Sequence, residues 1–150
     1  MNVQMQKPTN AFVGASWIAL LLGTGAYFIG LWNTETMTLN DKGYYFTIMM
    51  FGLFASVSLQ KSVRDKLEGL PVTGLYQGIC WFALLLSLVL MAVGLWEANF
   101  TDLEKGFYAM AYLLSLYATI TVQKNVRDLA LFADNTPRDS EDDDFSFFRR

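Results

Sequence analysis

The chain has 150 residues, of which 53% are hydrophobic and only 17% are charged. This length predicts one domain, and this balance is more apolar than that of a typical soluble domain. With no histidine and a single cysteine, the chain lacks the residues for histidine-ligated haem, most zinc sites and an intramolecular disulfide.

Four stretches contain no Asp, Glu, Lys or Arg, and they divide the chain. The first and third, residues 12–32 and 75–96, have 21 and 22 residues. A helix rises about 1.5 Å per residue, so each is long enough to cross a hydrocarbon layer of roughly 30 Å. The second and fourth, residues 44–59 and 107–122, have 16 residues each, and we expect flanking aromatic and basic side chains to extend them. The sequence therefore predicts an all-α membrane protein with four transmembrane helices.

The second half of the chain repeats the first. The segment WIALLL at residues 17–22 matches WFALLL at 81–86, and the stretches that contain them both end in Gly-Leu-Trp. The next stretch in each half is followed by Gln-Lys-x-Val-Arg-Asp, at residues 60–65 and 123–128. Polar matches of this kind do not arise from apolar low complexity, so we infer two copies of a helix, a loop of about ten residues and a second helix. Because residues 75–96 copy residues 12–32 in mid-chain, we interpret the first stretch as a retained helix and not as a cleaved signal peptide.

The repeat predicts the organisation of the chain. Each unit crosses the membrane twice, so both copies enter from the same side and form two parallel-repeat helical hairpins related by a pseudo-twofold axis. We expect an N-terminal segment at 1–11, a first repeat at 12–68, a linker at 69–74, a second repeat at 75–132 and a disordered acidic tail at 133–150.

The distribution of Lys and Arg predicts the orientation. Only Lys42 and Lys105 lie in the two predicted hairpin loops, whereas the other nine of the eleven lie in the N-terminal segment, the central linker region and the C-terminal region. Positive residues concentrate in the cytoplasm, so we expect both termini there. The four tryptophans fit this arrangement as interfacial anchors, because Trp17 and Trp81 begin the long stretches and Trp32 and Trp96 end them.

Small residues recur at equivalent positions of the two repeats. Lipid gives helices no hydrophobic reason to associate, so small side chains that allow close approach become important. We expect these residues to form a helix-packing seam, either within the chain or between copies in a homo-oligomer: Ala19, Gly23, Gly52, Ser56, Ala83, Ser87, Ser115 and Thr119.

The repeated polar motif supplies the candidate partner contacts of the chain. The Lys and the Asp of each motif lie four positions apart, a spacing that favours a weak ion pair along a helix, worth a few tenths of a kcal/mol. Two interpretations stay open. The side chains are interfacial anchors that fix depth and topology, or they form a paired site for anionic lipid headgroups or another anion. The residues concerned are Gln60, Lys61, Arg64, Asp65, Gln123, Lys124, Arg127 and Asp128.

The repeated hairpin has Gly-Leu-Trp at the end of its first helix and Gln-Lys-x-Val-Arg-Asp at the end of its second. With these two motifs it resembles the YiaA/YiaB two-helix domain family of bacterial inner-membrane proteins. The resemblance covers roughly residues 12 to 130 as two copies of the domain, and the acidic tail lies outside it. It implies a multi-pass protein of the bacterial inner membrane, and it implies no mechanism.

The sequence favours a protein without catalysis. It offers no histidine as a general base, no glycine-rich phosphate motif, no basic patch for nucleic acid and no Asp, Glu, Lys or Arg inside a predicted span. We therefore expect no cofactor and no metal, and we expect an interaction or scaffold protein with a homo-oligomeric or membrane-protein partner. The alternative is a small passive channel or facilitator. The hydroxyls that would line it, or would instead bond within and between helices, are Thr24, Thr47, Ser56, Ser58, Ser115, Thr119 and Thr121.

Overall fold

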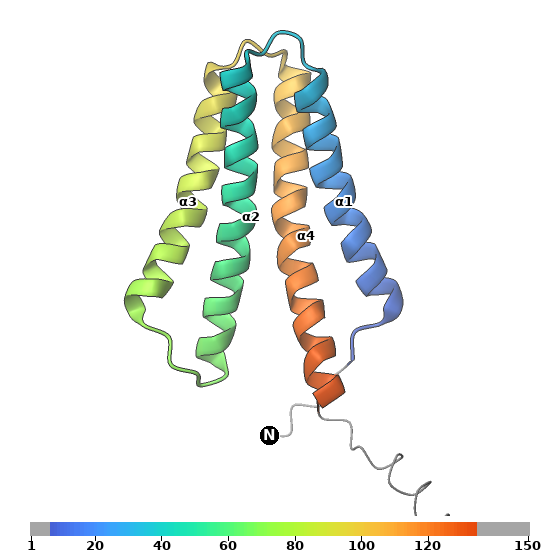
Figure 1. Ribbon diagram of the computed structural model, residues 1–150, viewed down its shortest axis with the longest axis vertical. Coiled ribbons are helices and arrows are strands. Elements are labelled where there is room, and N and C mark those ends of the chain that lie inside the picture. The colour runs from blue at the N-terminus through green and yellow to red at the C-terminus, as the bar shows by residue number, and fades with distance from the viewer. Residues whose placement is uncertain (1–6, 135–150) are drawn as a thin grey trace, which may run out of the picture.

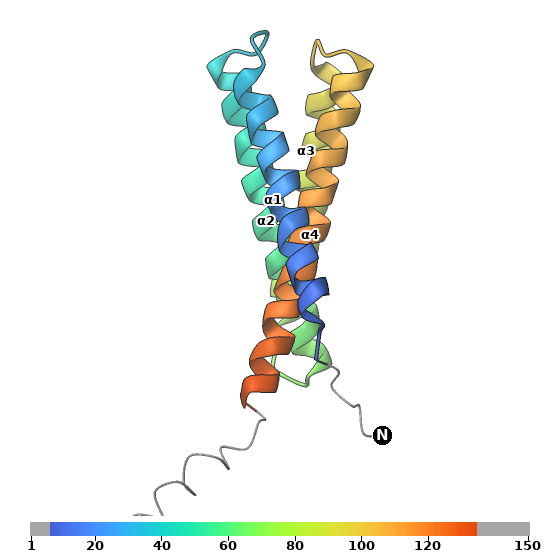
Figure 2. The same cartoon turned by 90° about the vertical axis from the view of Figure 1, so that its right-hand side faces the viewer.

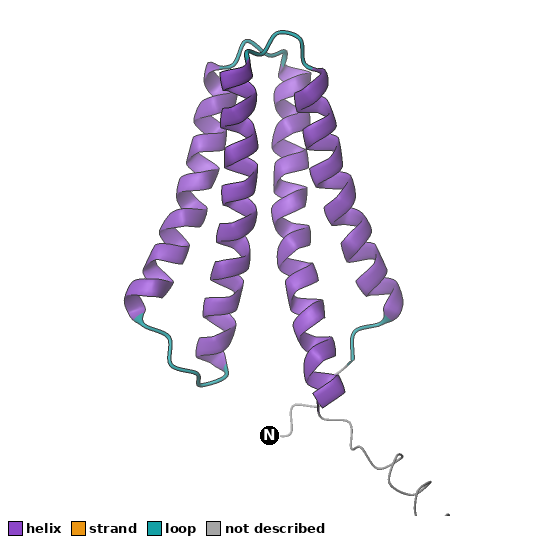
Figure 3. Cartoon of the chain, viewed as in Figure 1, coloured by secondary structure: helices purple, strands orange, loops and turns teal. Residues whose placement is uncertain are grey.

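The computed structural model describes residues 7–134 and shows four helices, with no strand in that range (Figures 1 and 3). Helix α1 spans Asn10–Asn33, α2 Leu39–Leu67, α3 Gly74–Glu97 and α4 Asp102–Asp134. The prediction of an all-α chain is confirmed. Helices α2 and α4 have 29 and 33 residues, well beyond their 16-residue apolar stretches, because the polar residues on both sides continue each helix.

Several predicted boundaries shift as a result. The loops within the repeats, residues 34–38 and 98–101, are about half the predicted length, because helical structure continues into them from both sides. Helix α1 begins at Asn10, inside the predicted N-terminal segment 1–11, and α3 begins at Gly74, the last residue of the predicted linker 69–74. Helix α4 includes residues 133–134, which were predicted to belong to the tail. The remainder of the predicted disordered tail, residues 135–150, lies outside the described residues.

A threonine precedes the first residue of every helix. Thr9 and Thr73 accept hydrogen bonds from the backbone N–H of Phe12 and Tyr76. Thr38 forms a reciprocal capping box with Asp41, and Thr101 pairs in the same way with Glu104. Because the first turn of a helix has backbone N–H groups without internal partners, these side chains fix where each helix begins.

The helices of one repeat contact the other repeat more than they contact each other. In Figure 1 the helices lie side by side in the order α3, α2, α4, α1, and α1 packs mainly on α4 while α3 packs mainly on α2. Contact between α2 and α4 joins these two pairs at the centre. Figure 2 shows loops 34–38 and 98–101 together at one end, called here the loop end. The opposite end, where α1 begins and α4 ends, is called the terminal end.

Close approach between α1 and α4 depends on Gly23. A Cβ atom at this position would lie 3.1 Å from the backbone nitrogen of Ser115 and 3.3 Å from the carbonyl oxygen of Ala111. On α2, a Cβ at Gly52 would lie 3.0 Å from a methyl carbon of Leu116. The structure buries six of the eight predicted seam residues and leaves Ala19 and Ala83 half-buried. The seam therefore lies between the repeats inside one chain.

The Gly-Leu-Trp motif has a separate role at each of its three positions. Gly30 and Gly94 lie under the rings of Phe107 and Tyr44, where a Cβ would come within 2.9 and 2.7 Å of a ring carbon. The leucines that follow are buried in the core. The tryptophans after them, Trp32 and Trp96, are 81% and 83% exposed at the loop end, whereas Trp17 and Trp81 are exposed nearer the terminal end.

Candidate functional site

Both copies of the Gln-Lys-x-Val-Arg-Asp motif lie in the C-terminal parts of the two central helices, toward the terminal end. Residues 60–65 belong to α2 and residues 123–128 to α4. Because α2 and α4 contact each other at the centre of the bundle, the two motifs face one another. The structure thus brings together two segments that lie 63 residues apart in the sequence.

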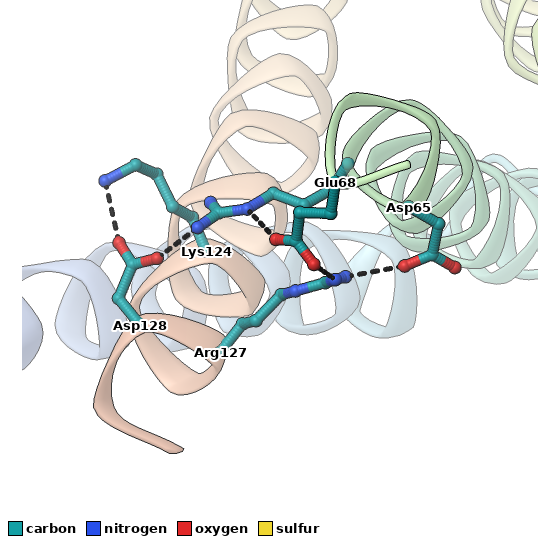
Figure 4. A network of polar contacts seen from close by, with 6 residues as sticks. Asp65, Glu68, Lys124, Arg127 and Asp128 are labelled. Carbon is teal, nitrogen blue, oxygen red and sulfur yellow. Dashed lines mark hydrogen bonds and ion pairs between the residues drawn. The ribbon is translucent and has the colours of Figure 1, made fainter. Parts of the chain in front are cut away.

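The two motifs exchange ion pairs reciprocally (Figure 4). The Nη2 atom of Arg64 on α2 lies 2.5 Å from Oδ1 of Asp128 on α4. In the equivalent contact, Nη1 of Arg127 lies 2.9 Å from Oδ1 of Asp65. These four side chains are only 13–23% exposed. Each arginine therefore pairs with the carboxylate of the other repeat.

A further carboxylate lies between the two arginines. Glu68, the residue that follows α2, accepts a hydrogen bond from Nε of Arg64 at 3.3 Å and also pairs with Arg127. The second repeat has Leu131 at the equivalent position, so this contact is asymmetric. We call the whole cluster the clasp. Its members are Lys61, Arg64, Asp65, Glu68, Lys124, Arg127 and Asp128.

The predicted pairs along each helix are also present. Lys61 lies 3.0 Å from Asp65, and Lys124 lies 3.0 Å from Asp128. Both lysine side chains are more than half exposed, at 60% and 53%. Each aspartate therefore accepts one hydrogen bond from its own helix and one from the other repeat.

These contacts keep the aspartates ionised. Hydrogen bonds from Lys61 and Arg127 lower the pKa of Asp65 below its ordinary value of 3.8. Burial acts to raise the pKa of Asp128, but hydrogen bonds from Lys124 and Arg64 outweigh it and the pKa falls. The clasp consequently has four cations and three carboxylates at neutral pH, and one positive charge is left over.

The variable position of each motif points inward instead of into the clasp. Ser62 and Asn125 are each 1% exposed, and they occupy equivalent positions on α2 and α4. The Nδ2 atom of Asn125 donates to Oγ of Ser16 on α1 at 3.1 Å. Sequence reasoning did not identify these two residues or Glu68. The burial of Ser62 could have been predicted, because Ser56, Leu59 and Ser62 follow each other at three-residue steps on one face of α2.

Comparisons with known proteins agree with the repeat. The family model described as the yiaA/B two helix domain matches twice, at residues 12–65 and 76–128. The Inner membrane protein YiaA of Escherichia coli K12 is 47% identical over 141 residues, which cover 94% of each chain. The Uncharacterized membrane protein YubF of Bacillus subtilis is 31% identical over 68 residues, which cover 45% of this chain and 78% of that protein. No solved structure matches the chain. The predicted resemblance is confirmed, and the chain belongs to the YiaA/YiaB two-helix domain family.

Proposed function

We propose that the chain is a four-span inner-membrane protein with both termini in the cytoplasm, and that it acts as a non-enzymatic scaffold for other membrane components. Helices α1, α2 and α3 are long and apolar enough to cross a membrane, and the relative in Escherichia coli is named as an inner membrane protein. The excess of Lys and Arg at the terminal end supports the cytoplasmic orientation.

Helix α4 is the least apolar candidate, and its position explains why it can still span. Tyrosines, serines and threonines dilute its hydrophobic stretch, but Tyr108, Tyr112 and Ser115 face the interior and are at most 3% exposed. Its neighbours α1 and α2 lie on either side of it (Figure 1). A helix shielded by protein needs fewer apolar residues than one surrounded by lipid.

The packed interior is the observation that favours a scaffold over a channel. Tyr27, Met49 and Tyr112 fill the centre of the bundle and are at most 2% exposed. Tyr27 donates to the backbone carbonyl of Tyr45 at 2.9 Å, and Tyr112 donates to Ser87 at 3.0 Å. Bulky side chains at the centre, two of them held in place by hydrogen bonds, favour a packed scaffold over a hydrated path along the axis.

Three of the seven hydroxyls considered for a channel lining also support this view. Thr24, Ser115 and Thr121 each donate to a carbonyl four residues earlier on their own helix, at 2.6–3.0 Å. A hydroxyl engaged in this way is satisfied without water. These residues therefore behave as ordinary helix-packing residues.

The partner surface that we propose is the terminal end. The exposed lysines of the clasp and its single excess positive charge favour an acidic membrane-protein partner, a second copy of the chain or anionic lipid headgroups. A groove of about 440 Å³ begins beside the clasp, where Arg64 and Lys124 border an apolar wall that includes Leu59 and Ile120. Such a groove suits an acyl chain below a phosphate. A change in copurifying lipid in the Arg64→Ala, Arg127→Ala double variant would support headgroup contact.

Crosslinking and solute flux together test the scaffold. A photoreactive residue at Lys124 should trap a discrete partner in native membranes, whereas one at lipid-facing Leu21, which is 66% exposed, should trap none. Liposomes that contain the purified chain should admit small solutes and ions no faster than protein-free liposomes. Flux that rises in proportion to the protein content would contradict the scaffold and support a channel. Identical crosslinking at both positions would contradict the proposed partner surface.

A further inference from the structure

Two pockets at the loop end occupy equivalent places in the two repeats. Each lies where the first helix of one repeat ends beside the start of the second helix of the other repeat. The larger has a volume of about 590 Å³ and includes Gly30, Glu104 and Phe107. The smaller has a volume of about 370 Å³ and includes the equivalent Gly94, Asp41 and Tyr44. A glycine, an acid and an aromatic ring thus recur at both sites.

The smaller pocket has the more complete set of aromatic walls. The rings of Tyr44 and Tyr45 meet at 85° with their centroids 5.4 Å apart. Phe100 lies 6.2 Å from Tyr45 and lines the same pocket. The hydroxyl of Tyr44 donates to the carbonyl of Leu90 at 2.7 Å, and its ring packs against Gly94. The walls are therefore held in place before any ligand arrives.

Two carboxylates add negative charge to these walls, and no Lys or Arg is among the residues that line the pocket. Asp41 caps α2, and hydrogen bonds from the side chain and the backbone of Thr38 lower its pKa below 3.8. Glu97 makes no hydrogen bond or ion pair with any residue in the described range 7–134. The pocket is therefore negative at neutral pH, with one carboxylate available to a ligand.

Negative charge beside aromatic faces is the chemistry that recognises an organic cation. The face of an aromatic ring attracts an ammonium group, and a nearby carboxylate adds a charge-assisted hydrogen bond. A metal ion fits less well, because calcium requires six to eight oxygen ligands and the described residues hold no group of three metal-binding side chains. We propose that the pocket formed by Tyr44, Tyr45, Phe100, Asp41 and Glu97 binds the ammonium group of a small organic amine.

The same ammonium chemistry is available from a free amine in solution and from the headgroup of an aminophospholipid. The purified full-length chain should therefore be placed in nanodiscs of phosphatidylglycerol and titrated with ethanolamine by calorimetry. We expect saturable binding that weakens about tenfold in Glu97→Gln, because this change removes a charge and keeps the shape of the side chain. Asp102→Asn is the matched control, since Asp102 is an exposed acid at the same end outside both pockets, and its affinity should equal that of the wild type.

A second arm identifies the source of the ammonium group. In nanodiscs of phosphatidylethanolamine, a headgroup that occupies the pocket would block added ethanolamine, whereas a site for free amines would bind it as before. Either result supports an ammonium pocket. The absence of saturable binding by the folded wild type in phosphatidylglycerol would overturn the proposal, and so would equal affinity in Glu97→Gln. Tighter binding of calcium than of ethanolamine would also overturn it.

Discussion

Gly23→Ala is expected to destabilise the folded chain by about 1–3 kcal/mol, although it adds a single methyl group. The new Cβ would lie 2.7 Å from Oγ of Ser115 and 3.1 Å from its backbone nitrogen. The hydroxyl of Ser115 donates a hydrogen bond to the carbonyl of Ala111. The backbone of α4, unlike a flexible side chain, cannot change its conformation to relieve the contact. Helices α1 and α4 must therefore separate. Thermal unfolding in detergent measures the change.

Gly25 provides the matched control two residues further along α1. No atom of another helix lies within 4 Å of a Cβ built there, so Gly25→Ala should be neutral or slightly stabilising, because alanine favours a helix more than glycine does. Gly23→Leu and Gly52→Leu should reduce the folded yield further. Equal stability of the Gly23→Ala and Gly25→Ala variants would show that α1 does not pack on α4 at this point.

Removal of one arginine–aspartate pair of the clasp should reveal a coupling of about 1 kcal/mol between the two repeats. The measurement is a double-mutant cycle on the free energy of unfolding with Arg64→Ala and Asp128→Ala. We expect a modest value because the two side chains retain 23% and 15% exposure, and water screens part of the attraction. A cycle of Lys42→Ala with Asp128→Ala is the control, because Lys42 lies at the loop end, and its coupling should be zero.

Acid should abolish the coupling between Arg64 and Asp128. The folded pKa of Asp128 lies below its ordinary value of 3.8, so the folded state favours the ionised carboxylate. The contribution of this carboxylate to the stability of the folded state is fully present above its unfolded pKa and is lost as the pH falls through its folded pKa. The cycle repeated at pH 7 and at acid pH well below 3.8 should therefore give a finite and a vanishing coupling. A coupling that persists in acid would mean that the pair does not act through charge.

The sequence allowed the presence of the four helices to be predicted, but their ends only in part. Uncharged stretches mark the part of a helix that faces lipid or core, and the polar turns that continue α2 and α4 have no such signal. The first residues of α2 and α4 could have been predicted, since Thr38 with Asp41 and Thr101 with Glu104 have the spacing of a capping box. The family was predicted correctly because its motifs combine polar residues at fixed positions.

Which helices pack against each other could not be derived from the sequence. A short loop suggests that the two helices of a repeat pack together, whereas α1 packs on α4, where Gly23 fits against Ser115. In the clasp, Arg64 and Asp65 are neighbours in the sequence, but neighbours on a helix point in different directions. Each arginine therefore pairs with the aspartate of the other repeat and not with the aspartate beside it in the sequence. This contact follows from the three-dimensional arrangement.

Cysteine labelling tests the parallel arrangement of the two repeats most directly. Cys80→Ser removes the single native cysteine, and serine should be tolerated because the equivalent residue of the first repeat is Ser16. Single cysteines at exposed Thr36 and Asn99 report on the two loops, and one at exposed Leu70 reports on the connection between the repeats. A membrane-impermeant maleimide added to intact spheroplasts should label positions 36 and 99, and it should label position 70 only after permeabilisation. Labelling of position 36 but not 99 would place the two loops on opposite sides of the membrane and would contradict the proposed architecture.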